Sequence, residues 1–322
     1  MSSVPAVPSP KYSLVIPVYK NEANLPPLVA ALDELSAKLG EGFEVVFVVD
    51  GSPDASFERL QGLLASRPFE SQLCLLSRNF GSFAAIAAGL REARGNYFAV
   101  MAADLQEPPA LILEFFRSLE TEPVDVTLGV RTGRADPLVS SLSSRTFWSV
   151  YRRLVQRDMP VGGVDVFGCN RAFRDRLIAL PESNSSLVGL VLWLGFRRKL
   201  VPYERKKREI GKSAWTRKKK FRYLSDSVFA FSDLPIRVLI MVGIIGMSVA
   251  AVLTTIVLIA KLRGSITIPG YTATVLSLFF FAGLNSFGLG IIGSYVWRSF
   301  ENTKQRPSSV ILLKQEFVKR QP

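Results

Sequence analysis

The sequence predicts an α/β domain built on a mainly parallel sheet, followed by a hairpin of two transmembrane helices. Short apolar runs alternate with segments of helical spacing in the N-terminal part, and two long uncharged stretches follow near the C-terminus. The first 200 residues contain 21 basic and 21 acidic residues, which leaves 19 of the 40 basic and 6 of the 27 acidic residues for the last 122. This distribution indicates a neutral domain joined to a basic membrane segment, not a uniformly basic nucleic-acid binder.

The alternation of apolar runs and helical spacing defines the elements of the first domain. Apolar or β-branched runs predict strands at 13–18, 43–49, 72–76, 97–101 and 124–129. Segments with leucine or small-residue helical spacing predict helices at 25–39, 57–64, 82–93 and 111–119. Strands that alternate with helices at this pace form βαβ units and a parallel sheet. Ligands of such sheets bind beyond the carboxyl ends of the strands.

Hydropathy predicts the membrane hairpin. Val238–Ala260 is a stretch of 23 residues without charge, which is long enough to cross a hydrocarbon core of about 30 Å. A second uncharged stretch, Gly264–Trp297, becomes apolar near Tyr271. Basic residues flank the pair and are scarce in its loop, so both termini and the α/β domain are expected in the cytoplasm. Two buried helices of a soluble protein are the alternative, but no core of matching size remains to cover them.

These features divide the chain into five segments. We expect a disordered N-terminus at 1–10, the α/β domain at 11–215, an interfacial amphipathic helix at 216–236, the hairpin at 237–298 and a cytoplasmic tail at 299–322. The end of this tail, Arg306–Pro322, is expected to be loose or strand-like. The apolar stripe of the amphipathic helix lies on the membrane surface or packs onto the domain. Leu187–Phe196 is too short to span a membrane and is expected in the domain core or in an interfacial patch. The first eleven residues lack the apolar run of a signal peptide.

Composition and missing motifs exclude several classes of function. The absence of His excludes Ser-His-Asp hydrolases and His-ligated zinc sites. Two cysteines form neither a disulfide framework nor a four-Cys zinc site, and they fit a reducing compartment. No G-x-G-x-x-G follows the first strand, which argues against a dinucleotide site. Gly211-Lys212-Ser213 resembles the end of a Walker A motif, but Lys206 stands where its first Gly should be.

Polar and turn-forming residues gather after three of the expected strands. The segments are Pro17–Glu22, Asp50–Asp54 and Ala103–Pro109. Each segment alone is typical of an ordinary turn. Their coincidence at three carboxyl ends of one sheet indicates a functional site.

At these residues the chain resembles the membrane-anchored glycosyltransferases of family 2 that act on polyprenyl phosphates, such as dolichol-phosphate mannose synthases and bactoprenol glucosyl transferases. The resemblance covers nearly the whole chain and adds further matches to the three segments above. These are Arg78–Gly81, Arg131, Asp165, Arg205–Ser213, the two spans and Arg306-Pro307. It implies a GT-A fold, which is a Rossmann-like α/β fold, and an inverting transfer of a sugar from a nucleotide sugar to a lipid phosphate. UDP-glucose as donor and undecaprenyl phosphate as acceptor are the favoured pair, giving a lipid-linked sugar for envelope glycans.

The resemblance also implies roles for individual residues. Asp165, Asp104 and Arg208 are implied in catalysis, with Asp165 as a base or as a positioning group. The residues implied for the nucleotide sugar are Pro17, Tyr19, Glu22, Asp50, Ala103, Asp104 and Arg208. Those implied for the acceptor phosphate are Arg131, Arg145, Ser149, Arg205, Lys212 and Ser213. Asp104 and Gln106 are implied as ligands of a divalent metal, Mg²⁺ or Mn²⁺.

The sequence departs from the family pattern at two positions. Val49 and Ala102 stand where family members often carry the first Asp of a pair, so a metal site with two carboxylates is in doubt. One carboxylate, one amide and the diphosphate oxygens of the donor still suffice for an octahedral ion. The chemistry also needs no His, because a metal and arginines stabilise the leaving diphosphate and a phosphate monoester is already anionic.

The basic segment Arg205–Arg222 has ten basic residues and a single acid, Glu209. Its early part matches the family's active-site segment, and its late part is expected to attract anionic lipid. Nucleic acid is not expected as a partner, whereas a homo-oligomer is. Two rivals stay open at this point. A processive polysaccharide synthase would normally carry a Gln-x-x-Arg-Trp motif, which is absent; a silent membrane scaffold of the same fold is favoured only by Val49 and Ala102.

Overall fold

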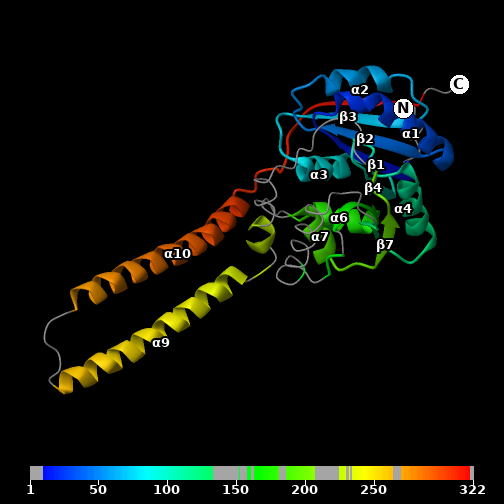
Figure 1. Cartoon of the computed structure of the whole chain (residues 1–322). Helices are drawn as coiled ribbons and strands as arrows, with labels where there is room; N and C mark the ends of the chain where they lie inside the picture. The colour runs from blue at the N-terminus through cyan, green and yellow to red at the C-terminus, as the bar shows by residue number, and fades with distance from the viewer. Residues whose placement is uncertain are drawn as a thin grey trace, which may run out of the picture.

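The computed structural model describes residues 10–132, 152, 158–160, 163–180, 186–206, 225–229, 232, 234–263 and 270–319. The described chain forms an α/β domain and a long helical hairpin that extends away from it (Figure 1). The expected α/β fold with a mostly parallel sheet is confirmed.

The domain is built on an eight-stranded sheet whose order is β7-β5-β6-β4-β1-β2-β3-β8. The strands are β1 (Tyr12–Val18), β2 (Phe43–Val49), β3 (Glu70–Leu76), β4 (Tyr97–Val100), β5 (Val126–Arg131), β6 (Val164–Asn170), β7 (Arg198–Tyr203) and β8 (Ile311–Phe317). β1 pairs in parallel with both β2 and β4, and the pairs β2–β3 and β5–β7 are also parallel. β6 runs antiparallel to β4 and β5, so β5 has the same direction as β4. Six strands, all but β6 and β8, therefore end at one edge of the sheet, which we call the carboxyl edge.

Helices cover both faces of the sheet (Figure 1). α1 (Leu25–Leu39), α2 (Ser56–Leu64) and α4 (Pro109–Thr121) bury their apolar residues against one face, and α3 (Ser82–Glu92), α6 (Arg171–Ile178) and α7 (Leu187–Trp193) against the other. β1 serves both layers, because Leu14 and Ile16 point to the first and Val15 to the second. Residues 187–192 of α7 are buried, so the first part of the apolar run expected at Leu187–Phe196 belongs to the core, whereas Trp193 is 61% exposed.

The last strand, β8, returns the C-terminal tail to the domain. It pairs antiparallel with β3, and this confirms the strand-like alternative for the tail. Phe317 packs against the first core layer and Ile311 against the second. Lys314 adds an ion pair to Glu92 of α3 with 2.8 Å between Nζ and Oε2. The tail expected at 299–322 is therefore partly an edge strand of the sheet.

The hairpin consists of α9 (Leu234–Leu262) and α10 (Tyr271–Thr303). Among the residues that the structure describes, no helix combines the length and the apolar character needed to cross a membrane. The two spans expected from the sequence are not supported by this finding and stay a prediction. Of the interfacial helix expected at 216–236, the structure describes a helical piece at 225–229, Ser232 and residues 234–236, which begin α9.

Polar and aromatic contacts close the base of the hairpin. Arg298 of α10 donates to Asp226 over 2.7 Å and lies 5.1 Å from the ring centre of Phe229. The ring of Tyr295 packs edge-on against Phe229 at 5.3 Å. These contacts fix the end of α10 to the helical piece that precedes α9.

Candidate active site

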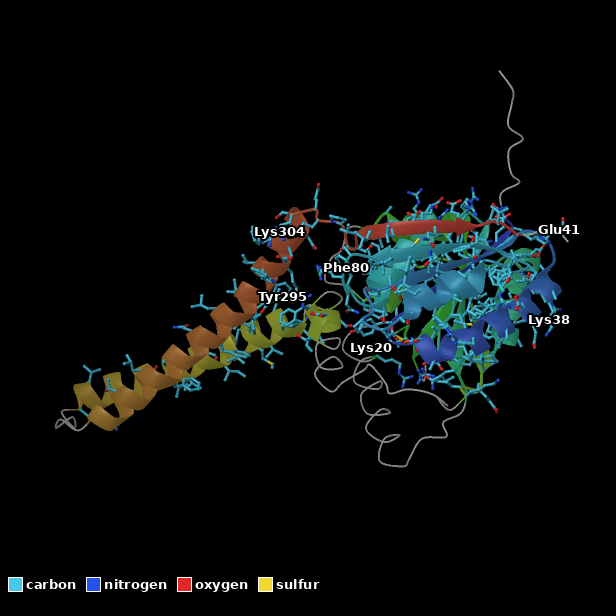
Figure 2. All side chains as sticks on the ribbon, turned by 90° about the horizontal axis from the view of Figure 1, so that it is seen from above. Lys20, Lys38, Glu41, Phe80, Tyr295 and Lys304 are labelled. Carbon is cyan, nitrogen blue, oxygen red and sulfur yellow. The ribbon has the colours of Figure 1, made fainter. Side chains whose placement is uncertain are left out.

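The carboxyl edge faces the base of the hairpin. Lys20 follows β1 and Phe80 follows β3, and both lie at the end of the domain nearest the hairpin, whereas Lys38 and Glu41 lie at the far end (Figure 2). The predicted residues Tyr19, Glu22, Asp50, Asp104 and Arg131 all follow or end strands of this edge. The structure thus brings the candidate residues of four separate turns to one side of the domain.

Carboxylates tie the turn after β1 to the turn after β2. The amide of Glu22 donates to Asp54 over 3.3 Å, and the carboxylate of Glu22 accepts the amide of Ala55 at 3.3 Å. The hydroxyl of Ser52 accepts the amide of Lys20 at 2.8 Å and donates to Asp54 at 2.6 Å. Lys20 has φ of 55°, a conformation that is costly for a non-glycine residue and persists where its surroundings fix it. The two turns therefore form one interlocked unit.

Asp54 carries a negative charge that this unit stabilises. Burial alone would raise the pKa of Asp54, but hydrogen bonds from Ser52, Ser56 and the backbone amides of Glu22 and Ser56 lower it below its ordinary value. Asp54 had no predicted role of its own within the segment Asp50–Asp54. The sequence pattern that could have identified Asp54 is an Asp two residues before a Ser that begins a helix. Asp side chains at helix starts accept backbone amides.

Asp50 is buried and holds the turn after β3. Its two carboxylate oxygens accept the amides of Phe80 at 2.7 Å and Gly81 at 2.8 Å. Its backbone carbonyl accepts the side chain of Asn79 at 3.3 Å. The role in nucleotide binding that the resemblance implies for Asp50 stays a prediction. In this structure the carboxylate shapes the loop that leads into α3.

The turn after β4 contains Asp104, Leu105 and Gln106. Ala103 is buried, and Leu105 has φ of 53°, so the backbone makes a tight left-handed turn. Asp104 accepts the amide of Gln106 at 3.3 Å. The side-chain oxygen of Gln106 accepts Arg205 at 2.6 Å, and its amide nitrogen donates to the carbonyl of Lys206 at 3.2 Å. The segment after β7 is therefore bound directly to this turn.

The donor groups of this turn fit a divalent metal only in part. A carboxylate such as Asp104 is a ligand that Mg²⁺ and Mn²⁺ prefer, but the oxygen that Gln106 would offer already accepts a guanidinium. No group of three or more acidic, Cys or His side chains is placed to hold an ion in the described residues. Asp104 therefore fits the implied metal, whereas Gln106 does not in the conformation seen here.

The remaining predicted residues fall at the carboxyl edge or outside the described residues. Arg131 is the last residue of β5 and lies in register with Tyr203 at the end of β7. Asp165 lies in β6, and its side chain is outside the described part. Arg145, Ser149, Arg208, Lys212 and Ser213 also lie outside the described residues. The structure therefore places the acceptor-side prediction only at Arg131 and Arg205.

Comparison with known proteins gives the same class as the fold and the turns. Residues 13–179 match the family model for glycosyl transferase family 2. The chain is 32% identical to an uncharacterized glycosyltransferase of Bacillus subtilis, YkcC, over 94% of this chain and 93% of the relative. It is 27% identical to the bactoprenol glucosyl transferase of Shigella phage SfV, over 94% and 98% of the two chains.

Solved structures show a more distant likeness. Glucosyl-3-phosphoglycerate synthase from Mycobacterium tuberculosis, in complex with Mn²⁺, UDP and glucosyl-3-phosphoglycerate, has a TM-score of 0.46 and 16% identity. The alignment covers 69% of this chain and 78% of that one.

Ligands of parallel α/β sheets bind beyond the carboxyl ends of the strands, and the polar turns of this chain lie there. The chain belongs to glycosyltransferase family 2. It is a glycosyltransferase, as the sequence predicted.

Proposed function

We propose that this protein transfers a hexose, with inversion, from a nucleotide sugar to a polyprenyl phosphate at the cytoplasmic face of a membrane. UDP-glucose is the favoured donor and undecaprenyl phosphate the favoured acceptor; the product is a lipid-linked sugar for envelope glycans. One observation carries the proposal: Lys20 and Phe80 mark the carboxyl edge at the end of the domain nearest the hairpin (Figure 2), and Asp104 and Arg131 follow or end strands of that edge. A lipid phosphate held near the hairpin would meet a donor bound at that edge.

The relatives support the acceptor class. Several of them are named bactoprenol glucosyl transferases, and their similarity extends over 94% of this chain, hairpin included. Similarity across the hairpin is what a shared lipid acceptor would require, because a soluble acceptor would need only the domain. Glucose as the transferred sugar rests on the same names.

The chemistry requires charge stabilisation more than proton transfer. The bond between the anomeric carbon and the diphosphate breaks, and its electron pair stays on the leaving nucleoside diphosphate. An oxygen of the acceptor phosphate forms the new bond from the opposite face of the sugar, which inverts the anomeric carbon. A phosphate monoester is mostly dianionic near neutral pH, so it needs orientation and not a base. Arg131 is suited to that orientation, because a guanidinium binds phosphate oxygens in two places.

A divalent cation completes the donor side of the proposal. Bound at Asp104, it would supply positive charge to the diphosphate as the leaving group departs. Asp104 would hold the ion together with the diphosphate oxygens of the donor, since Ala102 has no ligand to offer. Arg208 stays proposed for the donor phosphates, and Arg145, Ser149, Lys212 and Ser213 for the acceptor phosphate.

The membrane location rests on the sequence and on the exposed side chains of the hairpin. The uncharged stretch Val238–Ala260 and the basic residues before and after the hairpin predict a membrane anchor with a cytoplasmic domain. Large apolar side chains are more than half exposed along both helices: Ile240, Ile244, Ile245, Val252, Leu278, Phe280, Phe287 and Leu289. Exposed apolar surface of this extent needs an apolar partner, and lipid is the one proposed. Anionic lipid near the basic segment and a homo-oligomer remain part of the proposal.

Product analysis tests the proposed reaction. Purified full-length protein is incubated with undecaprenyl phosphate, Mn²⁺ and one nucleotide sugar at a time, and the lipid product is identified by its mass. We expect a hexosyl undecaprenyl phosphate from UDP-glucose. Nucleotide-sugar hydrolysis with no lipid product from any donor would refute the acceptor, and a product from another donor would refute only the sugar.

Cysteine labelling tests the location. Cys74 and Cys169 are both fully buried, and burial raises the pKa of Cys74 to about 12, so neither is expected to react with a maleimide. Single cysteines at Lys38, on the domain, and at Arg263, between α9 and α10, are then the only reactive sites. In intact cells an impermeant maleimide should label the Arg263→Cys variant and not the Lys38→Cys variant. Labelling of both or of Lys38→Cys alone would refute the proposed orientation.

A further inference from the structure

The segment after β7 is clasped to the Asp104 turn through one glutamine. The side chain of Gln106 accepts Arg205 at 2.6 Å and donates to the carbonyl of Lys206 at 3.2 Å. The backbone carbonyl of Gln106 accepts the amide of Lys206 at 2.9 Å. Three hydrogen bonds thus join a single residue of the turn to two consecutive residues 99 and 100 positions later.

Arg205 also faces a buried carboxylate. The side chain of Glu107 is 1% exposed, and its Oε1 lies 3.9 Å from Nε of Arg205. The side chain of Arg205 is itself only 29% exposed. A charge buried to this degree is costly unless cations and hydrogen bonds compensate it. The guanidinium is therefore committed both to Gln106 and to Glu107.

This commitment is at odds with the role in acceptor binding that the resemblance implies. Nη2 of Arg205 donates to Gln106 and its Nε faces Glu107, so a phosphate could take this side of the guanidinium only by displacing both partners. A partner left behind in a buried site costs more than the new contact returns.

We propose that Arg205 is a positioning residue of the donor site: it clasps Gln106 and Glu107 and so holds the Asp104 turn in the shape that receives the nucleotide diphosphate. The inference rests on the proposed function, since it concerns the donor half of the same site. It predicts that removal of the Arg205 side chain weakens donor binding and leaves acceptor binding unchanged. It also predicts that Arg205 and Gln106 act as one unit.

The test compares four variants with a matched control. Arg205→Ala, Arg205→Lys, Gln106→Ala and the double variant Arg205→Ala/Gln106→Ala are made in the full chain. Arg198→Ala is the control, because Arg198 begins β7, the strand that precedes Arg205, is 31% exposed and pairs with Asp158 at 2.9 Å outside the carboxyl edge. UDP binding with Mn²⁺ is measured by calorimetry without acceptor, and KM for donor and acceptor is measured separately.

We expect Arg205→Ala to weaken UDP binding about tenfold or more, the size of a lost charge-assisted hydrogen bond, with acceptor KM nearly unchanged. The Lys variant should recover part of the affinity, because it keeps the charge near Glu107 and loses the fork. The double variant should bind UDP as Arg205→Ala does, within about twofold, since contacting residues are not additive. Arg198→Ala should match wild type. A raised acceptor KM with UDP affinity intact, or additive losses in the double variant, would overturn the proposal.

Failure of the proposed function can be told apart from failure of this inference. If wild type binds UDP but makes no lipid product, the acceptor assignment fails while the calorimetric comparison still decides the role of Arg205. If wild type binds no nucleotide, the donor assignment fails. The coupling between Arg205 and Gln106 is then measured from the unfolding midpoints of the same variants. Additive shifts of the midpoint in Arg205→Ala and Gln106→Ala would contradict the coupling.

Discussion

Four carboxylates at the carboxyl edge each accept at least one amide of the protein's own backbone, and among them Asp104 is the one proposed to hold the metal. Asp50 accepts the amides of Phe80 and Gly81, and Glu22 accepts the amide of Ala55. Asp54 accepts two hydroxyls and two amides. Asp104 lies in a left-handed turn of its own after β4. Residue identity alone did not separate these roles, because each carboxylate follows a strand of the same sheet.

Replacing Asp104 by Asn should nearly abolish transfer while the fold survives. The Asn side chain keeps an oxygen for the amide of Gln106, which Asp104 accepts at 3.3 Å, but it loses the charge that attracts the metal. We expect kcat/KM at limiting Mn²⁺ to fall on the order of 100-fold or more, as when one preorganised electrostatic group is removed. Asp33→Asn, which breaks only an ion pair to Arg67 on the far helices, is the control. Turnover like wild type by a folded Asp104→Asn protein would remove the proposed metal site.

Replacing Arg131 by Ala should affect the acceptor and spare the nucleotide. Arg131 ends β5 at the carboxyl edge, and a guanidinium that orients a phosphate contributes a strong hydrogen bond. The KM for undecaprenyl phosphate should rise by roughly tenfold, or kcat should fall to match, with UDP affinity unchanged by calorimetry. Arg117→Ala, on the exposed face of α4, should alter neither value. Loss of UDP binding with acceptor dependence intact would mean that the two halves of the site are assigned the wrong way round.

The turn after β2 should not tolerate a side chain at Gly51. Its φ is +53°, and a Cβ there would lie 2.3 Å from the carbonyl carbon of Arg78 and 2.5 Å from the amide nitrogen of Asn79. Gly51→Ala should lower the free energy of unfolding by roughly 2 kcal/mol or more, because strain and a backbone clash add. Gly40 has φ of +73° with open space around it, so Gly40→Ala should cost about 1 kcal/mol from backbone strain alone. Equal losses in chemical unfolding would show that the close approach of the two turns has no energetic weight.

At the scale of secondary-structure elements, the sequence predicts the bounds best where a run or spacing of apolar residues is followed directly by a residue that ends the element. The helix at 25–39 and the strand at 43–49 have the bounds of α1 and β2, because each carries a clear apolar period and ends at Gly or Asp. β6, α6 and β7 were not predicted. Arg198–Tyr203 mixes charged, apolar and Pro residues, and only its pairing with β5 makes it a strand. Long-range pairing of this kind leaves little local signal.

The candidate site was likewise predictable only in part. The three turns could be predicted because they follow buried runs directly in the sequence. Their internal contacts could not, because the partner of Gln106 lies 99 residues away and that of Asp50 lies 30 residues away. The Asp50 contact depends on the order of β2 and β3 in the sheet, and the Gln106 contact on the direction of β7.

The last strand, β8, should stabilise the fold through its apolar contacts and not through its ion pair. Phe317 packs against the core layer formed with α1 and α2, whereas Lys314 and Glu92 form a pair that is about one-third exposed. Phe317→Ala should lower the free energy of unfolding by roughly 1–2 kcal/mol, the loss expected for a partly buried aromatic side chain. Lys314→Ala should cost between about 0 and 1 kcal/mol. Chemical unfolding of both variants checks this order, and a larger loss from Lys314→Ala would contradict it.

At the scale of the whole molecule, the hairpin is joined to the domain through β8. The base of α10 is fixed to residues 226–229 by Arg298 and Tyr295, and the chain after α10 continues into β8 of the catalytic sheet. The contacts of Arg298 and Tyr295 hold the base of the hairpin together, and β8 connects that base to the sheet. The carboxyl edge lies on the hairpin side of the domain (Figure 2), where a lipid phosphate is proposed to enter.

The most direct test is a structure of the full chain in a lipid nanodisc with UDP, Mn²⁺ and undecaprenyl phosphate. The account predicts the diphosphate and the metal beside Asp104 at the carboxyl edge. The lipid phosphate should lie at the same edge, in contact with Arg131 and between the diphosphate and the base of the hairpin. A nucleotide bound away from the turn after β4 would contradict this account. A lipid phosphate at the end of the domain away from the hairpin, near Lys38 and Glu41, would contradict it as well.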